Sequence, residues 1–164
     1  MSRSNKVLRA TAAVIFSLVL SAWTHHKIYD PDRDPARDLA AAKIEAARNG
    51  KKILLSVGGN WCSWCLAFDR FLHENPFVKQ RWDETFVTVK VNVSDENRNE
   101  KFLAQYPRVS ALPLLFVLDS DGTLIDEQRT GVFEQGKSYS QDRLLEFVDQ
   151  WHGETKSLRL AEQK

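Results

Sequence analysis

The two cysteines of this 164-residue chain stand in one tetrapeptide, Cys62-Ser63-Trp64-Cys65. An apolar run, residues 53–57, leads to the tetrapeptide, and a helical pattern follows it. This order places the first thiol at the N-terminus of a helix, where unpaired backbone N–H groups and the helix dipole favour a thiolate. The second thiol lies one turn further on, within disulfide reach. The spacing therefore predicts a dithiol that opens and closes reversibly.

Two other uses of a C-x-x-C pair fit this sequence less well. A structural zinc ion normally takes four Cys or His ligands. The chain has four histidines, at 25, 26, 73 and 152, and none of them supplies the spaced pair that a two-cysteine zinc site uses. A disulfide across four residues removes only about 2 kcal/mol of unfolded-state entropy, which makes it a weak staple. We expect no stable metal, and no cofactor beyond the two thiols.

The first 22 residues have the layout of an export signal. Arg3, Lys6 and Arg9 precede an uncharged stretch, residues 10–22, that ends in small side chains. This stretch is shorter than the roughly 20 residues that span a bilayer as a helix. We predict that residues 1–22 are a signal peptide, or alternatively a short membrane anchor, and that the protein is periplasmic or otherwise extracytoplasmic. An oxidising compartment suits a chain whose thiols share one motif.

Composition fits one compact domain without a nucleic-acid surface. The chain is 43% hydrophobic and 27% charged, as expected of a globular domain. Its 23 basic and 22 acidic residues nearly balance, and no basic stripe with interleaved aromatic residues occurs. We therefore expect no nucleic-acid partner.

Hydrophobic periodicity predicts an α/β domain over residues 36–152. A polar lead-in, residues 23–35, precedes the domain, and a polar C-terminal tail, residues 153–164, follows it. Strands that alternate with helices, followed by a hairpin and a last helix, give a mixed central sheet flanked by helices. The expected strands are 52–57, 86–93, 114–118 and 123–127, and the expected helices are 35–49, 62–82 with a break at Asn75-Pro76, 95–106 and 140–151.

With these elements in place, the chain resembles the thioredoxin superfamily over about residues 36–152. The resemblance rests on the strand leading to Trp61-Cys62-Ser63-Trp64-Cys65, on Leu112-Pro113 before an apolar strand, and on the hairpin-plus-helix ending. Within the superfamily the chain is most similar to exported thioredoxin-like domains, including those that end transmembrane thiol:disulfide interchange proteins. The resemblance implies a thioredoxin-like fold, Cys62 as the attacking thiol, Cys65 as the resolving thiol, and a cis Leu112–Pro113 bond.

Six residues around the thiols are candidates for substrate binding. A cis proline would let the backbone of Leu112 pair with an extended substrate segment, and Gly131 could allow a close backbone approach. Trp61 is expected to be partly buried with an edge that faces the substrate, whereas Trp64 is expected to be exposed. The candidates are Trp61, Ser63, Trp64, Leu112, Pro113 and Gly131.

One position departs from the family pattern. Many thioredoxins have a buried acid six residues before the first cysteine, and this chain has Ser56 there. A neutral hydroxyl neither acts as a base nor raises the pKa of the resolving thiol by like-charge repulsion. Water or substrate is therefore expected to carry the proton. Asp69, four residues after Cys65, is expected to be a solvated surface carboxylate.

The predicted reaction is thiol–disulfide exchange with client proteins that carry disulfides or thiols, fed by a membrane redox partner. The reductase or isomerase direction is favoured because Ser63-Trp64 holds no cation that would stabilise the reduced form. The alternative is a thioredoxin-fold binding protein, either redox-inactive or copper-handling. Cleavage after Ala22 would create an N-terminus, Trp23-Thr24-His25, whose nitrogens suit Cu(II), with His26 as a further ligand.

Overall fold

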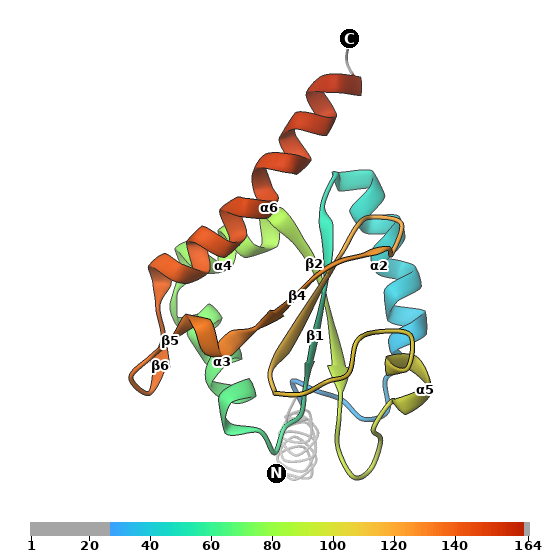
Figure 1. The fold of residues 1–164 in the computed structure, drawn as a ribbon, viewed down its shortest axis with the longest axis vertical. Helices are drawn as coiled ribbons and strands as arrows, with labels where there is room; N and C mark the ends of the chain where they lie inside the picture. Colours follow the sequence, from blue (N-terminus) through green and yellow to red (C-terminus); the bar gives the residue numbers. More distant parts are fainter. Residues whose placement is uncertain (1–26, 163–164) are drawn as a thin grey trace, which may run out of the picture.

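The protein is described here by a computed structural model that covers residues 27–162, with side chains up to His152. The expected signal peptide and the histidines of the copper alternative lie outside these residues. A four-stranded mixed sheet of order β2-β1-β3-β4 forms the centre (Figure 1). β1 pairs in parallel with β2 and antiparallel with β3, and β3 pairs antiparallel with β4. The strands are β1 (Lys52–Gly58), β2 (Phe86–Asn92), β3 (Leu114–Leu118) and β4 (Leu124–Arg129).

Helices cover both faces of this sheet. In Figure 1, α2 (Pro35–Asn49) and α5 (Glu100–Leu103) lie on one side, and α3 (Ser63–Glu74), α4 (Pro76–Thr85) and α6 (Gln141–Glu162) lie on the other. A short helix, η1 (Thr130–Phe133), and a small two-stranded ribbon, β5 (Glu134–Gln135) and β6 (Ser138–Tyr139), connect β4 to α6. Each face has its own apolar core. The layers are those of an α/β sandwich with a thioredoxin-like fold, as predicted.

The helix and the strand that precede the cysteines begin and end close to where the sequence predicts. Asp34 caps α2 by accepting a hydrogen bond from the Ala36 N–H at 2.9 Å, and Gly50 ends that helix with a φ of 61°. All seven residues of β1 are buried, because helices pack on both of its faces. β1 is thus a rigid central support for the loop that follows it.

The predicted helix 95–106 is wrong. Only Glu100–Leu103 is helical, and the preceding residues form a loop closed by polar side chains. The Asn92 amide donates to the Asn97 carbonyl at 2.7 Å, and the Asn99 amide donates to the Asn92 carbonyl at 2.8 Å. Asn99 itself has a φ of 49°. Short polar side chains that bond to nearby backbone compete with helix formation, which explains the loop.

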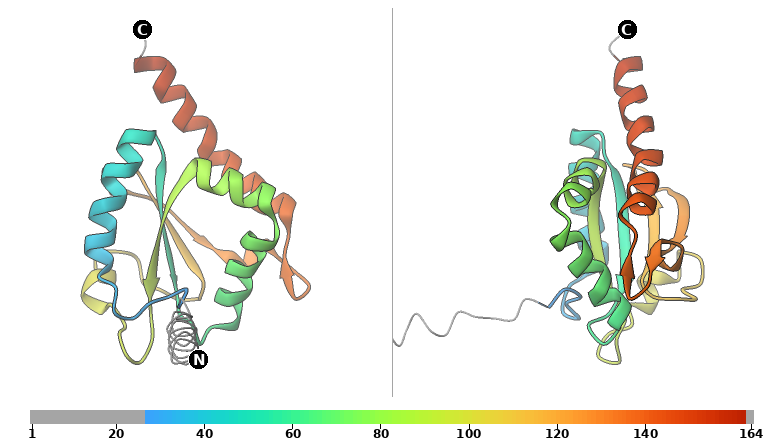
Figure 2. Two further views of the ribbon diagram at one scale, coloured as in Figure 1. Left: turned by 180° about the vertical axis from the view of Figure 1, so that it is seen from behind. Right: turned by 90° about the vertical axis from the view of Figure 1, so that its left-hand side faces the viewer.

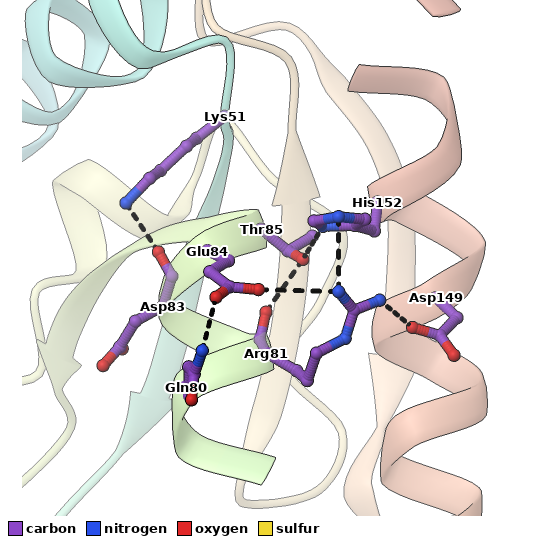
Figure 3. Close-up of polar contacts among 8 residues, drawn as sticks. All are labelled: Lys51, Gln80, Arg81, Asp83, Glu84, Thr85, Asp149 and His152. Carbon is purple, nitrogen blue, oxygen red and sulfur yellow. Dashed lines mark hydrogen bonds and ion pairs between the residues drawn. The ribbon is translucent and has the colours of Figure 1, made fainter. Parts of the chain in front are cut away.

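A polar cluster joins α4 to α6 on the face opposite α2 (Figure 3). Arg81 donates to Asp149 Oδ1 at 2.5 Å and to His152 Nε2 at 3.3 Å, and the His152 Nδ1 lies 3.0 Å from the hydroxyl of Thr85. His152 therefore has a structural role between two helices.

The last helix is longer than expected. α6 continues to Glu162, across most of the segment that we expected to be a polar tail, and it projects past the end of the sheet (Figure 2). Among the described residues, no helix is both long and apolar enough to cross a membrane.

Candidate active site

The loop after β1 places the two cysteines at the start of α3. Cys62 is the capping residue of this helix, and its sulfur accepts a hydrogen bond from the Cys65 N–H at 3.2 Å. The two sulfurs are joined as a disulfide. Cys62 remains 8% exposed, whereas Cys65 is fully buried. Both cysteines are therefore largely buried, and Cys62 is the one of the two that borders the groove described next.

An open groove of about 840 Å³ borders Cys62. Its walls are mostly apolar, with an ion pair between Arg98 and Asp95 at 3.1 Å among the lining residues. The buried sulfur of Cys65 is not part of the lining. An extended, partly apolar chain could reach the Cys62 sulfur along this groove. The apolar lining residues are Trp61, Val93, Leu103, Val109, Ala111 and Leu112.

The two tryptophans have the opposite environments to those expected. Trp61 is 66% exposed, and its indole N–H donates to the Val93 carbonyl at 2.7 Å. Trp64 is half-buried, packs against the apolar core under α3, and meets Tyr139 edge-to-face at 5.5 Å between ring centroids. The reason lies in helix geometry. Trp64 is the second residue of α3 and packs against the core and Tyr139, while Trp61 precedes the helix and lines the groove.

Of the remaining candidates for substrate binding, only Leu112 lines the groove. The Leu112–Pro113 peptide bond is cis, and Leu112 lines the groove beside Cys62. Pro113 is buried, and its carbonyl accepts a hydrogen bond from the Thr130 hydroxyl at 3.1 Å. Ser63 is exposed as the first residue of α3, outside the lining of the groove. Gly131 is also exposed and is not among the lining residues.

Tyr29 is the residue that the sequence analysis missed. It belongs to the segment expected only to lead into the domain, yet it is fully buried and forms one cluster with Cys62 and Cys65. Its hydroxyl lies 3.0 Å from the hydroxyl of Ser56, which is also fully buried. The Asn60 side chain accepts from the Tyr29 N–H at 3.1 Å and donates to the Tyr29 carbonyl at 2.6 Å. The lead-in is thus tied directly to the cysteine loop.

Gly58 explains how Tyr29 comes so close. A Cβ at this glycine would lie 2.6 Å from the Tyr29 ring carbon that bears the hydroxyl, and 2.9 Å from the Cys65 sulfur. Only a residue without a side chain leaves space for both groups. The one signal in the sequence is that Ile28-Tyr29 is an isolated apolar pair in an otherwise polar segment, and it does not name a partner.

Asp69 is an ion-paired residue, so the expectation of a solvated carboxylate is wrong. Its side chain is 16% exposed, and Oδ1 lies 3.1 Å from Lys90 Nζ. Oδ2 lies 3.4 Å from the His73 ring. Lys90 Nζ in turn lies 5.1 Å from the centroid of the Tyr29 ring, which permits a cation–π contact. The charged pair of Lys90 and Asp69 therefore lies next to Tyr29, and Lys90 is the register partner of Ser56 on the adjacent strand.

Within the described part of the chain, no cluster of three or more His, Cys, Asp or Glu side chains could hold a metal ion. The site brings together two sulfurs at a helix N-terminus, an apolar groove, and a buried pair of hydroxyls.

Comparison with known proteins agrees with this geometry. The sequence model of the thioredoxin-like family matches residues 34–120. A thiol:disulfide interchange protein DsbD of Photorhabdus laumondii is 23% identical over 99 residues, which are 60% of this chain and 17% of that protein. The DsbD of Citrobacter koseri is 27% identical over 95 residues, which are 58% and 16% of the two chains. The chain therefore spans about a sixth of the length of these relatives.

Solved structures show the same fold. A disulphide isomerase from Xylella fastidiosa superposes with a TM-score of 0.65 at 24% identity, over 76% of this chain and 99% of the other. The oxidised C-terminal domain of Neisseria meningitidis DsbD gives a TM-score of 0.54 at 23% identity, over 72% and 96%. The family model covers more than half of the chain and includes both cysteines. The chain belongs to the thioredoxin-like family.

Proposed function

We propose that this protein is an exported thiol–disulfide oxidoreductase that acts on protein disulfides through Cys62 and Cys65. The different positions of the two cysteines relative to the groove carry this proposal. Cys62 borders an open apolar groove at the N-terminus of α3, and Cys65 is sealed beneath it. Attack on a client requires an accessible thiolate, whereas the resolving thiol needs to reach only the sulfur of Cys62.

In the reductive direction, the Cys62 thiolate attacks one sulfur of a client disulfide. A bond forms between Cys62 and the client, the client disulfide breaks, and its second sulfur leaves with the electron pair and takes a proton. The Cys65 thiolate then attacks Cys62, which releases the client thiol and forms the Cys62–Cys65 disulfide. Two electrons pass from the enzyme to the client. The α3 N-terminus favours the Cys62 thiolate, and no acidic residue in its first turn opposes this.

The groove and Leu112 would hold the client chain. Leu112 lines the groove beside Cys62, where its backbone would pair with an extended segment of the client. Trp61, exposed at the same wall, adds apolar area next to Cys62. The proposed partners are client proteins with disulfides or thiols and a membrane redox partner that returns electrons to the enzyme.

The reductase or isomerase direction is part of the proposal. Ser63 and Trp64 between the cysteines carry no positive charge, and Arg98 of the groove is paired with Asp95. A strong oxidant needs its reduced form to be stabilised. The expected reduction potential is therefore nearer to the about −270 mV of thioredoxin than to the about −120 mV of a strong disulfide donor.

The test combines a potential with a trapping experiment. The potential of the purified chain is measured by equilibration in glutathione and dithiothreitol buffers, with alkylation to count free thiols. In parallel, Cys65→Ser is mixed with a disulfide-bonded client and analysed on a non-reducing gel. We expect Cys65→Ser to accumulate a mixed disulfide, while Cys62→Ser forms none. The absence of a reversible couple, or equal trapping by both variants, would refute the proposal. A potential near −120 mV would refute its direction alone.

A further inference from the structure

Tyr29 has a feature that packing alone does not require, namely a hydroxyl buried beside the resolving sulfur. A point next to the Cα of Gly58, where a Cβ would stand, is 2.8 Å from the Tyr29 hydroxyl and 2.9 Å from the Cys65 sulfur. The two atoms therefore flank one small space. In the disulfide form the hydroxyl is paired with Ser56 at 3.0 Å.

This space matters when the disulfide opens. Cys65 is fully buried, so a thiolate there lacks water to stabilise its charge. A donor hydrogen bond favours the charged form of a buried group. The cluster around the cysteines holds the Tyr29 ring, Ile28, Trp64 and Leu112. Within it, the Tyr29 hydroxyl faces the same small space at Gly58 as the Cys65 sulfur. The nearby charges, Lys90 over the ring face and Asp69 beyond it, are paired with each other.

We propose that Tyr29 is a catalytic hydrogen-bond donor to the Cys65 sulfur. When the disulfide is reduced, the Tyr29 O–H turns from Ser56 to the sulfur, and the Ser56 O–H donates to the Tyr29 oxygen in its place. The two hydroxyls exchange roles without a change in charge, and Ser56 acts as a positioning residue. This inference rests on the proposed function, since it concerns the step in which Cys65 resolves the mixed disulfide.

Behind the resolving cysteine this chain has uncharged hydroxyl groups, where many thioredoxins have a buried acid. A tyrosine held by Asn60 and backed by Ser56 supplies a donor but no negative charge behind Cys65. Before the attack, the proton of the Cys65 thiol passes to water that must reach the sulfur once the disulfide has opened, and Tyr29 remains a hydrogen-bond donor. The thiolate then displaces the client sulfur from Cys62, and the electron pair leaves on the client.

The test separates the two steps of exchange. The reduced protein is mixed with excess dithiobis-nitrobenzoate, an aromatic disulfide whose released thiolate absorbs visible light. Attack by Cys62 releases one thiolate, and resolution by Cys65 releases the second. We compare the wild type with Tyr29→Phe, which keeps the ring and removes the hydroxyl. Tyr106→Phe is the matched control, because its ring stacks on Phe116 in the core under α2 and α5, away from the cysteines.

We expect Tyr29→Phe to leave the first phase unchanged and to slow the second phase about threefold near neutral pH. Loss of the donor lowers the thiolate fraction about tenfold, and the greater nucleophilicity of the more basic thiolate offsets about half of this on a logarithmic scale. The midpoint of the second phase against pH should move up by about one unit. In Cys62→Ala, where Cys65 is the sole cysteine, thiolate absorbance in the ultraviolet should report the same shift.

Ser56→Ala provides a second variant if Tyr29→Phe does not fold, as checked by its unfolding transition. It should shift the second phase in the same direction by a smaller amount, because Tyr29 loses the group that supports it as a donor. Curves of the second phase against pH that superimpose on wild type would overturn the role of Tyr29 and leave the proposed function intact. If the wild type releases no thiolate, the proposed function fails, and this inference fails with it.

Discussion

Gly58 and Gly131 differ sharply in the space around them. A Cβ at Gly58 would lie within 3 Å of Tyr29 and of the Cys65 sulfur, whereas the nearest atom to a Cβ at Gly131 is a carboxylate oxygen 3.8 Å away. We expect Gly58→Ala to lower the free energy of unfolding by about 1–3 kcal/mol, the usual cost of overpacking a core. Urea unfolding of the oxidised protein measures this effect. Gly131→Ala is the control, and equal midpoints for the two variants would contradict the packing described around Tyr29.

Replacing each of the two tryptophans of the motif by alanine should have different effects. Trp64 packs against Tyr139 and the core, so Trp64→Ala should lower the free energy of unfolding by about 2–3 kcal/mol. Trp61 is exposed, and its replacement by alanine removes one hydrogen bond, to the Val93 carbonyl. Trp61→Ala should therefore change the free energy of unfolding by no more than about 1 kcal/mol. Trp61→Ala should instead weaken client binding, seen as slower exchange with a protein disulfide than with a small one. The reverse order of stabilities would restore the original expectation for Trp64.

At the level of residues, sequence reasoning finds groups whose chemistry is local. The spacing of Cys62 and Cys65 implies a helix N-terminus and a disulfide, because both depend on a few neighbouring residues. The partnership of Tyr29 with Ser56 joins residues 27 positions apart, and the pairing of Asp69 with Lys90 depends on how α3 lies against β2. Neither pairing has a spacing signal within one element.

Among the elements, the β5–β6 ribbon links α3 to the last helix through Tyr139. Its hydroxyl donates to the Trp64 carbonyl at 3.2 Å, and its ring meets Phe68 edge-to-face at 5.0 Å. Burial is the main cause that raises the pKa of Tyr139 to about 12, from an ordinary value of 10.0. The folded state therefore favours the neutral hydroxyl more than the unfolded state does.

This shift predicts a loss of stability in alkali. The contribution of Tyr139 is fully present below pH 10 and is lost as the pH rises from about 10 to about 12, because the unfolded chain releases the proton first. The unfolding free energy of the wild type should fall more steeply over this window than that of Tyr139→Phe. Denaturant titrations at several pH values give both curves. In the difference between the two curves, the contributions of the titratable groups that both chains share cancel. Parallel curves would show that Tyr139 titrates alike in both states.

Elements with a strong apolar pattern were predictable, and those decided by polar side chains were not. β1 and β3 are continuous apolar runs buried on both faces, so length and composition identify them. The segment before α5 has helix-compatible charges, but Asn92, Asn97 and Asn99 close it into a loop by side-chain bonds. Such bonds depend on conformation, and periodicity does not report them. The two-residue strands of the ribbon are too short to produce a pattern.

For the whole molecule, the order of strands and helices was enough to predict the layers but not the edge of the domain. The family match begins at residue 34, and the first helix begins at Pro35. The structure nevertheless buries Tyr29 beneath β1, and the amide of Asn97 donates to the Pro31 carbonyl at 2.8 Å. The folded unit therefore includes a segment that carries neither a helix nor a strand.

A chain that begins at Asp34 should consequently be less stable than one that begins at Lys27. The shorter chain lacks a fully buried tyrosine and leaves Ser56 without the hydroxyl that pairs with it. Removal of a large buried aromatic side chain costs about 3–5 kcal/mol, and the unpaired Ser56 hydroxyl adds to this loss. Urea unfolding of the two chains, both oxidised, measures the difference. Tyr29→Ala in the longer chain is the matched variant and should account for most of the loss, whereas equal midpoints for the two lengths would place the edge of the domain at α2.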